Sequence, residues 1–308
     1  RNSKFGFKSM AASFPPDVIV LDTESLMHAR LARGKKGPQI VQAKSYGLPP
    51  DTFVPAVVTP QLTNEASLAD VLRRLRVESG RWDRASLLLP DSWFRINILD
   101  LPNFPESSKE AEDVVRWSLK RTMPIDSTLL RLRHEVLSRN AGQTKVLSIS
   151  AMDETLGAIE KVFEAAGIAV VVIEPIGLNI WNAITLREPN TSRDRIFFYI
   201  REGEFTTAAF RGSQPLFIRS RNLNSDRTIE QEIKLSASYI RDTLRTDAIE
   251  QCYLSGDVDS SIASVVGAEF GAPVRTIALS DFSERRPDGI GVGAYEAELT
   301  ACTGVFTS

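Results

Sequence analysis

Hydrophobic residues in the first part of the chain gather in short runs that alternate with polar stretches. The run Val18–Leu21 is uniformly apolar, which is typical of a buried strand. Two further runs, 26–32 and 40–46, are separated by a glycine-containing turn, so an antiparallel arrangement of all three is favoured. Apolar residues then recur at helical spacing over 68–75, and another strand-like run follows at 86–89. The pattern predicts three strands, a helix and a fourth strand.

The second half of the chain repeats this order of elements. Runs typical of strands lie at 195–200, 204–210 and 215–221, with glycine-containing turns between them. A long amphipathic stretch at about 227–244 predicts a helix, and a strand is expected at 251–254. The repetition is one of element order and not of individual residues. We therefore expect two related α/β domains.

Additional elements lie between these two halves. Residues 93–101 alternate between apolar and polar, as in a half-buried strand, and Ser107 with Glu110 predicts a capping box at the start of a helix. Strand-like runs at 130–137 and 146–151 and a helix and strand up to residue 174 complete this part. We expect an α/β subdomain inserted into the first half. The expected boundaries are 17–89 plus 173–190 for the first subdomain, 90–172 for the insertion and 193–304 for the second domain.

Short motifs follow one another through the inserted segment. In chain order they are Leu99-Asp100-Leu101-Pro102, Val115-Arg116-Trp117, Met123-Pro124-Ile125-Asp126 and His134-Glu135-Val136-Leu137. This progression, and the passage at 164–175 that ends in Ile173-Glu174-Pro175, resembles PilM-type type IV pilus assembly proteins. The resemblance implies an actin-like fold, which is a duplicated ribonuclease-H-like α/β fold, with an inserted α/β subdomain and a relationship to FtsA. The element order derived above agrees with that fold.

The resemblance also implies a partner and a location. Relatives of this type are cytoplasmic and are held at the inner membrane through the N-terminal cytoplasmic tail of a PilN-like membrane protein. In such proteins the inserted subdomain carries the partner contacts. Arginine and aromatic side chains suit the capture of a short apolar peptide, so we select Arg95, Arg116 and Trp117 as candidate partner-binding residues. The cytoplasmic part of a type II secretion platform protein is the alternative, and the resemblance leaves homo-oligomerisation open.

Composition narrows the classes of function. The chain has 308 residues with 37 basic and 39 acidic side chains, for a formal net charge of −2, so we expect no nucleic-acid partner. The longest apolar run, 168–173, is too short to span a membrane, and residues 1–16 lack the apolar segment of a signal peptide. We expect a cytoplasmic protein that contacts the membrane only through a partner.

Cysteine and histidine are scarce. The two cysteines, Cys252 and Cys302, and the two histidines, His28 and His134, are too few for a disulfide scaffold or a Cys/His zinc module. We expect the cysteines to be inert and the histidines to be packed or on the surface. We therefore assign no catalytic residue and no metal ligand.

The phosphate loops that the resemblance implies are altered in this sequence. Actin-like ATPases use glycine at these hairpins because the backbone must approach the phosphates closely. In the first loop Asp22 and Ser25 match the family pattern, but Glu24 stands in place of the expected glycine. A carboxylate at that position would repel phosphate.

The second and third loops depart from the pattern as well. Tyr199 and Arg201 replace the acidic residue and the glycine of the second loop, and we expect Arg201 to be a solvated hairpin residue. In the third loop Ser255 and Gly256 keep a family-like turn, but Asp257 replaces a second glycine.

The candidate cofactor-binding residues are Asp22, Ser25, Ser255 and Gly256. We expect a degenerate site that binds either no cofactor or ATP with magnesium, and a scaffold rather than an enzyme. An active actin-like ATPase, a phosphotransferase and a polymerising cytoskeletal element are the rival functions.

Overall fold

The structure is a computed structural model that covers most of the chain. It describes residues 7–8, 15–34, 37–80, 82–121, 125–140, 142–188, 191–201, 203–223, 227–244, 248–284 and 286–305. Three parts of the sequence predictions lie outside the described residues: the Met-Pro pair of the third motif, Glu202 of the second loop, and residues 189–190 of the expected first subdomain.

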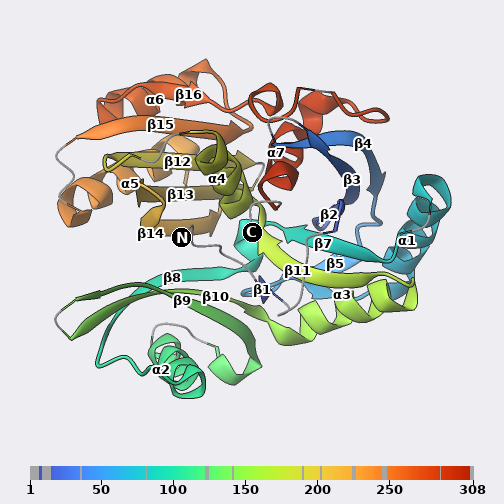
Figure 1. The fold of residues 1–308 in the computed structure, drawn as a ribbon, viewed down its shortest axis with the longest axis horizontal. Coiled ribbons are helices and arrows are strands. Elements are labelled where there is room, and N and C mark those ends of the chain that lie inside the picture. The colour runs from blue at the N-terminus through green and yellow to red at the C-terminus, as the bar shows by residue number, and fades with distance from the viewer. Residues whose placement is uncertain are drawn as a thin grey trace.

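The first domain is built on a six-stranded sheet with the order β1-β11-β7-β2-β3-β4 (Figure 1). Strands β2, β3 and β4 form the antiparallel meander expected from the sequence, and β7 and β11 continue the sheet in parallel with β2. Every residue of β2 is buried because both faces of the sheet are covered, which explains its uninterrupted apolar run. The strands are β1 (Phe7–Lys8), β2 (Asp17–Leu21), β3 (Ser25–Gly34), β4 (Gly37–Gly47), β7 (Arg84–Leu89) and β11 (Ala169–Pro175). A small hairpin of β5 (Phe53–Val54) and β6 (Gln61–Leu62) precedes the first long helix.

Helices α1 (Glu65–Ser79) and α3 (Asp153–Ala165) lie side by side on one face of this sheet. The Asn64 side chain caps α1 by accepting a hydrogen bond from the backbone N–H of Ser67 at 3.1 Å. Gly80 ends the helix with a φ of 81°, a conformation that glycine adopts without a steric penalty. The helical repeat at 68–75 is the buried face of α1, as its spacing predicted.

The second domain has a five-stranded sheet with the order β14-β13-β12-β15-β16. This order repeats that of the first sheet from β4 to β11, with the meander on one side and the parallel strands on the other. The actin-like fold class expected from the sequence is therefore confirmed. The elements are β12 (Asp194–Arg201), β13 (Glu204–Arg211), β14 (Gln214–Asn222), α5 (Ile229–Leu244), β15 (Ile249–Gly256), α6 (Ser260–Phe270) and β16 (Val274–Thr276).

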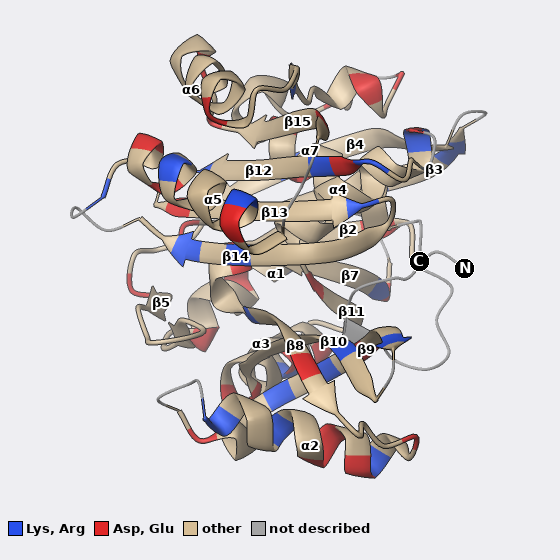
Figure 2. Ribbon diagram, turned by 90° about the vertical axis from the view of Figure 1, so that its left-hand side faces the viewer, with Lys and Arg blue, Asp and Glu red and all other residues tan. Residues whose placement is uncertain are grey.

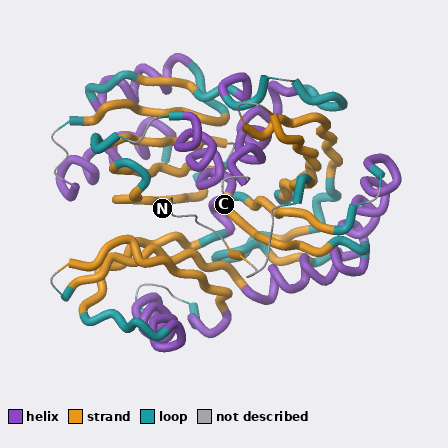
Figure 3. The backbone as a smooth tube through the Cα atoms, viewed as in Figure 1, coloured by secondary structure: helices purple, strands orange, loops and turns teal. Residues whose placement is uncertain are grey.

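Two helices lie between the sheets and join the domains (Figures 1 and 3). They are α4 (Ile176–Arg187) and α7 (Glu296–Gly304). The helices cross so closely that a Cβ atom on Gly304 would lie 1.8 Å from the backbone carbonyl oxygen of Asn179. Trp181 of α4 stacks on Phe210 of the second sheet with 3.9 Å between ring centroids. The two domains therefore share a continuous core at this crossing.

The inserted part contains a three-stranded antiparallel sheet with the order β8-β10-β9. Its elements are β8 (Arg95–Pro102), α2 (Ser108–Lys120), β9 (Leu130–Asn140) and β10 (Gln143–Met152). Val115 and Leu119 of α2 share a small core with Leu101 and Val146 of the sheet, so α2 covers one face. The expected boundary between residues 172 and 173 falls within β11, and this strand as a whole pairs with β7 of the first sheet.

The expected capping box of α2 is absent. Ser107 occupies the N-cap position, but its side chain makes no capping hydrogen bond. The start of the helix was therefore predicted correctly, while the reciprocal side-chain bonds with Glu110 were not.

Four short 3₁₀ helices complete the structure: η1 (Asp91–Trp93), η2 (Ser127–Leu129), η3 (Leu279–Asp281) and η4 (Val292–Tyr295). Across the described ranges, no helix combines the length and the apolar character that a membrane crossing requires.

Candidate functional site

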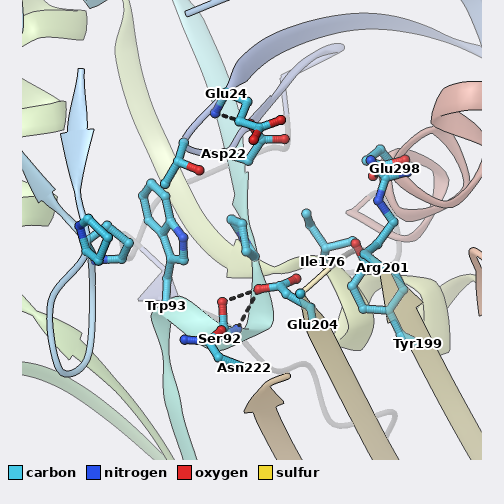
Figure 4. Close-up of a pocket in the computed structure, with 15 residues that line it drawn as sticks. Asp22, Glu24, Ser92, Trp93, Ile176, Tyr199, Arg201, Glu204, Asn222 and Glu298 are labelled. Atoms are coloured by element: carbon cyan, nitrogen blue, oxygen red, sulfur yellow. Dashed lines mark hydrogen bonds and ion pairs between the residues drawn. The ribbon is translucent and has the colours of Figure 1, made fainter. Parts of the chain in front are cut away.

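A cleft of about 340 Å³ lies between the two domains, where the β2–β3 turn faces the β12–β13 hairpin (Figure 4). The first domain contributes the β2–β3 turn, η1 and a proline-rich loop near β5. The second domain contributes β12, β13 and the start of α7. Carboxylate side chains dominate the polar part of the lining: Asp22, Glu24, Glu204 and Glu298.

The β2–β3 turn satisfies its polar groups internally. The Asp22 carboxylate accepts hydrogen bonds from the backbone N–H groups of Glu24 at 2.7 Å and Ser25 at 2.6 Å. The Ser25 hydroxyl donates to the other carboxylate oxygen of Asp22 at 3.1 Å. Two N–H groups that a phosphate-binding loop would present to a ligand are thus taken by Asp22. Glu24 is exposed at the cleft, as its position in the motif predicted.

Arg201, at the end of β12, is an ion-paired residue of the cleft and not the solvated hairpin arginine that we expected. Its guanidinium lies 3.1 Å from the carboxylate of Glu298 and 3.9 Å from that of Asp257, and it donates to the backbone carbonyl of Ala294. Burial is the largest single effect and lowers the pKa of Arg201, but the surrounding negative charges, led by that of Glu298, together outweigh it, and the net shift is upward. The expectation was wrong because α7 packs over the hairpin and brings Glu298 to it.

A hydrogen-bonded bridge spans the cleft from one domain to the other. The hydroxyl and backbone N–H of Ser92 in η1 both donate to the carboxylate of Glu204 at the start of β13. Burial, together with the nearby charge of Asp91, raises the pKa of Glu204 to about 7. Asp91 itself accepts a hydrogen bond from the backbone N–H of Gly177 at 2.7 Å, and burial raises its pKa to about 6.

The glycine of the third loop, Gly256, is explained by the packing of two strands. Gly256 has a φ of +94°, and a Cβ atom there would lie 1.9 Å from the backbone carbonyl oxygen of Ile200 on β12. Ser255 is buried in β15 opposite Tyr199. The close approach of two parallel strands therefore accounts for the glycine without any ligand.

Of the four residues selected as cofactor-binding, Asp22 lines the cleft and Ser25 is bonded to it in the same turn. Ser255 and Gly256 lie at the end of β15 and are not among the lining residues of the cleft. The sequence analysis missed Glu204 and Glu298. The sequence signal for Glu298 is weak: it is one of two glutamates, with Glu296, in the first turn of the otherwise uncharged stretch that forms α7.

The histidines and cysteines lie away from the cleft. His28 is fully buried, with Nε2 2.7 Å from the carboxylate of Asp17 and its ring stacked on Trp82. His134 is half-buried against Phe104, and burial lowers its pKa. Burial raises the pKa of Cys252 to about 12, so its thiolate is scarce at neutral pH. Cys302 is also buried, as expected.

The candidate partner-binding residues fall into two places. Arg95, at the start of β8, donates to the backbone carbonyls of Val57 and Phe94 at the junction with the first domain. Arg116 ties α2 to η2 by donating to Glu112 and to the carbonyls of Ser127 and Leu130. Trp117, the next residue of α2, is exposed.

Comparison with known proteins gives matches of structure alone: no family model and no curated protein sequence matches the chain. The chain is similar to a structure described as the PilM–PilN type IV pilus biogenesis complex, with a TM-score of 0.75 and 18% identity over 94% of this chain and 97% of that chain. A Bacteroides thetaiotaomicron protein with an actin-like ATPase fold gives a TM-score of 0.56 and 12% identity over 92% and 95% of the two chains. The cytoplasmic domain of EpsL, from the type II secretion system of Vibrio cholerae, gives 0.52 and 11% over 95% and 94%.

These matches extend over nearly the whole chain, the inserted part included, and the first agrees with the resemblance found in the sequence motifs. The chain thus has an actin-like fold with an inserted α/β subdomain, and its structure is similar to that of the PilM–PilN complex.

Proposed function

We propose that this protein is a cytoplasmic scaffold of an inner-membrane assembly platform, in a type IV pilus or a related secretion system. The similarity to a PilM–PilN complex and to the cytoplasmic domain of EpsL supports this proposal. In this role the chain binds the N-terminal cytoplasmic tail of a PilN-like membrane protein and reaches the membrane surface through it.

In this proposal the cleft between the domains does not hydrolyse ATP. The observation that supports the absence of hydrolysis is that carboxylates line the cleft. Asp22, Glu24, Glu204 and Glu298 face the cleft, and the one guanidinium among its lining residues, that of Arg201, is already paired with Glu298. Polyphosphate placed here would meet the negative charge of Asp22 and Glu24, and of Glu204 where it is ionised, in a partly desolvated site where repulsion is stronger than in water. The Ser92–Glu204 bridge also ties the two domains together across this space.

A nucleotide titration tests this part of the proposal. We expect a fluorescent ATP analogue with magnesium to show no saturable binding at micromolar concentration, and phosphate release to stay at background. Asp22→Ala should change neither measurement, because Asp22 is bonded within its own turn. Micromolar binding or turnover that disappears in Asp22→Ala would establish the rival ATPase or phosphotransferase function.

We place the tail of the membrane partner at the junction of the inserted subdomain with the first domain. Val57 and Val54 expose apolar side chains there, at 69% and 39% of their maximum, and Arg95 lies against the carbonyl of Val57. An arginine beside exposed apolar groups can bind the backbone carbonyls or the acidic groups of an extended apolar peptide. Both arginines donate to backbone carbonyls, but Arg116 lies within the inserted subdomain, whereas Arg95 lies beside the exposed valines of the junction, so Arg95 is the arginine best placed for the tail.

Calorimetry with a synthetic peptide of the partner's N-terminal tail tests this placement. Arg95→Ala and Val57→Asp should each weaken binding about tenfold, which corresponds to about 1.4 kcal/mol. Trp117→Ala is the matched control, since it removes an exposed side chain on α2 and should leave the affinity unchanged. Binding that survives both junction variants, or that Trp117→Ala abolishes, would refute the placement. Binding of the full-length partner without binding of its tail would refute tail recognition itself.

A further inference from the structure

The outward face of α2 carries the most exposed aromatic side chain among the described residues. Trp117 is 62% exposed, and the guanidinium of Arg121 lies over its ring at 5.1 Å from the centroid. The other three tryptophans, Trp82, Trp93 and Trp181, are all buried. Tryptophan is enriched at protein interfaces, so a tryptophan this exposed, on a helix whose opposite face is already buried, is a candidate contact residue.

Charges are arranged along α2 on both sides of this tryptophan. Glu110 and Asp113 precede Trp117, and Lys120 and Arg121 follow it, at spacings that place all five on one exposed face of the helix. Along α2 (Figure 2) the acidic residues all lie in the first half, where Lys109 is the one basic residue, and Arg116 and Lys120 lie in the second half. We call these five residues the α2 stripe.

Among the described residues, no ion pair neutralises the charges of the stripe; Lys120 acts on Asp126 through its charge only as a minor effect. Asp113 and Arg121 are eight positions apart, about 12 Å along the helix axis, which is too far for an ion pair. None of the four charged stripe residues forms a salt bridge with another residue in the described part of the chain. On the flank of the same helix, by contrast, Arg116 pairs with Glu112 at 2.7 Å.

We propose that the α2 stripe is a homotypic interface that binds the α2 stripe of a second copy of this chain in antiparallel orientation. A two-fold axis at Trp117 places the two indole rings against each other. Asp113 and Arg121 each lie four positions from this axis, about 6 Å, on opposite sides. In the antiparallel pair, Asp113 of each chain is therefore opposite Arg121 of the other, with Lys120 and Glu110 beside them. One stripe is complementary to itself only in this orientation.

The size of this contact sets its expected strength. A single pair of helices buries less surface than a standard protein–protein interface, so the dimer should be weak and dependent on concentration. Each exposed ion pair contributes little free energy of binding, and salt screens it. We therefore expect the ion pairs to fix the register of the two helices and Trp117 to supply most of the affinity. This interface is separate from the cleft and from the tail site at Arg95, so it does not rest on the proposed function.

Sedimentation equilibrium of the full chain, from micromolar to millimolar concentration, tests the proposal with two charge-reversed variants. One variant, Glu110→Lys with Asp113→Lys, has a wholly basic stripe, and the other, Lys120→Glu with Arg121→Glu, has a wholly acidic stripe. We expect the wild type to dimerise and each variant alone to associate at least about tenfold more weakly, because like charges now oppose each other. An equimolar mixture of the two variants should regain association at or above the wild-type strength. Trp117→Ala should weaken the wild-type dimer about tenfold or more.

The mixture also serves as a folding control. If a variant associated weakly because it was unfolded, it would not bind the other variant, so restored association in the mixture excludes that explanation. A wild type that stays monomeric to millimolar concentration would overturn the proposal and leave the stripe to a different protein. Dimerisation that both charge-reversed variants retain would overturn it as well, because the contact would then lie elsewhere.

Discussion

Gly256→Val is expected to lower the free energy of unfolding by about 4 kcal/mol or more. Gly256 has a φ of +94°, which a β-branched residue adopts only with strain. A Cβ atom would also lie 1.9 Å from the carbonyl oxygen of Ile200, so β12 and β15 would have to separate. Urea denaturation followed by far-ultraviolet circular dichroism measures the loss, provided the variant folds at all.

Gly203→Val provides the matched control for this substitution. Gly203 also has a positive φ, of +74°, but its Cβ position has no atom within 4 Å. Only backbone strain should be felt there, at about 1 kcal/mol. Equal losses in the free energy of unfolding at the two positions would show that backbone strain alone causes the loss. The close approach of β12 and β15 would then not be the reason for the glycine at position 256.

The second large effect concerns pH. Glu204 and Asp91 have pKa values raised to about 7 and about 6, chiefly because their contact with water is reduced: Asp91 is fully buried, and Glu204 is half-buried at the cleft. Each carboxyl therefore holds its proton more tightly in the folded state than in the unfolded state, and folding is favoured while the group is protonated. The free energy of unfolding should fall as pH rises from about 4 to about 7 and then level off. Each group can contribute up to about 3 kcal/mol to this fall.

Glu204→Gln should remove part of this pH dependence. The amide oxygen of glutamine can still accept the hydrogen bond from Ser92, and it carries no charge to bury. Thermal unfolding should show the variant more stable than the wild type at pH 8 and nearly equal to it at pH 5. Glu24→Gln, which changes an exposed carboxylate of the same cleft, serves as the control and should shift stability little at either pH. A variant that is less stable than the wild type at pH 8 would contradict this prediction. It would show that the ionised Glu204 carboxylate stabilises the folded state more than a neutral group does.

Local features of the chain were predictable because they depend on neighbours in sequence. A helix was expected from the repeat at 68–75, and α1 forms there because Asn64 caps its start and Gly80, with a φ of 81°, ends it. The order of strands in both domains likewise followed from the alternation of apolar runs and turns. The similarity to PilM was visible in short motifs of the inserted segment before the fold was known.

The composition of the cleft was less predictable because it depends on contacts between distant segments. Glu298 lies in a helix of small residues and becomes a cleft residue only because α7 packs against Arg201. Glu204 follows a hairpin turn, and only the position of η1 brings Ser92 to it. The sequence shows directly that the glycines of the phosphate loops are replaced. The carboxylates of the cleft come together through contacts between distant segments, which the spacing of apolar residues does not predict.

The crossing of α4 and α7 has a consequence for how the molecule can move. At Gly304 the two helix backbones touch without a side chain between them, and Asn179 provides the facing carbonyl. No side chain can be inserted at this crossing, so the helices cannot separate there without loss of packing, and we expect any relative motion of the domains to be centred on it. The Ser92–Glu204 bridge across the cleft restrains such motion. We therefore expect the relative orientation of the two domains to change little in solution.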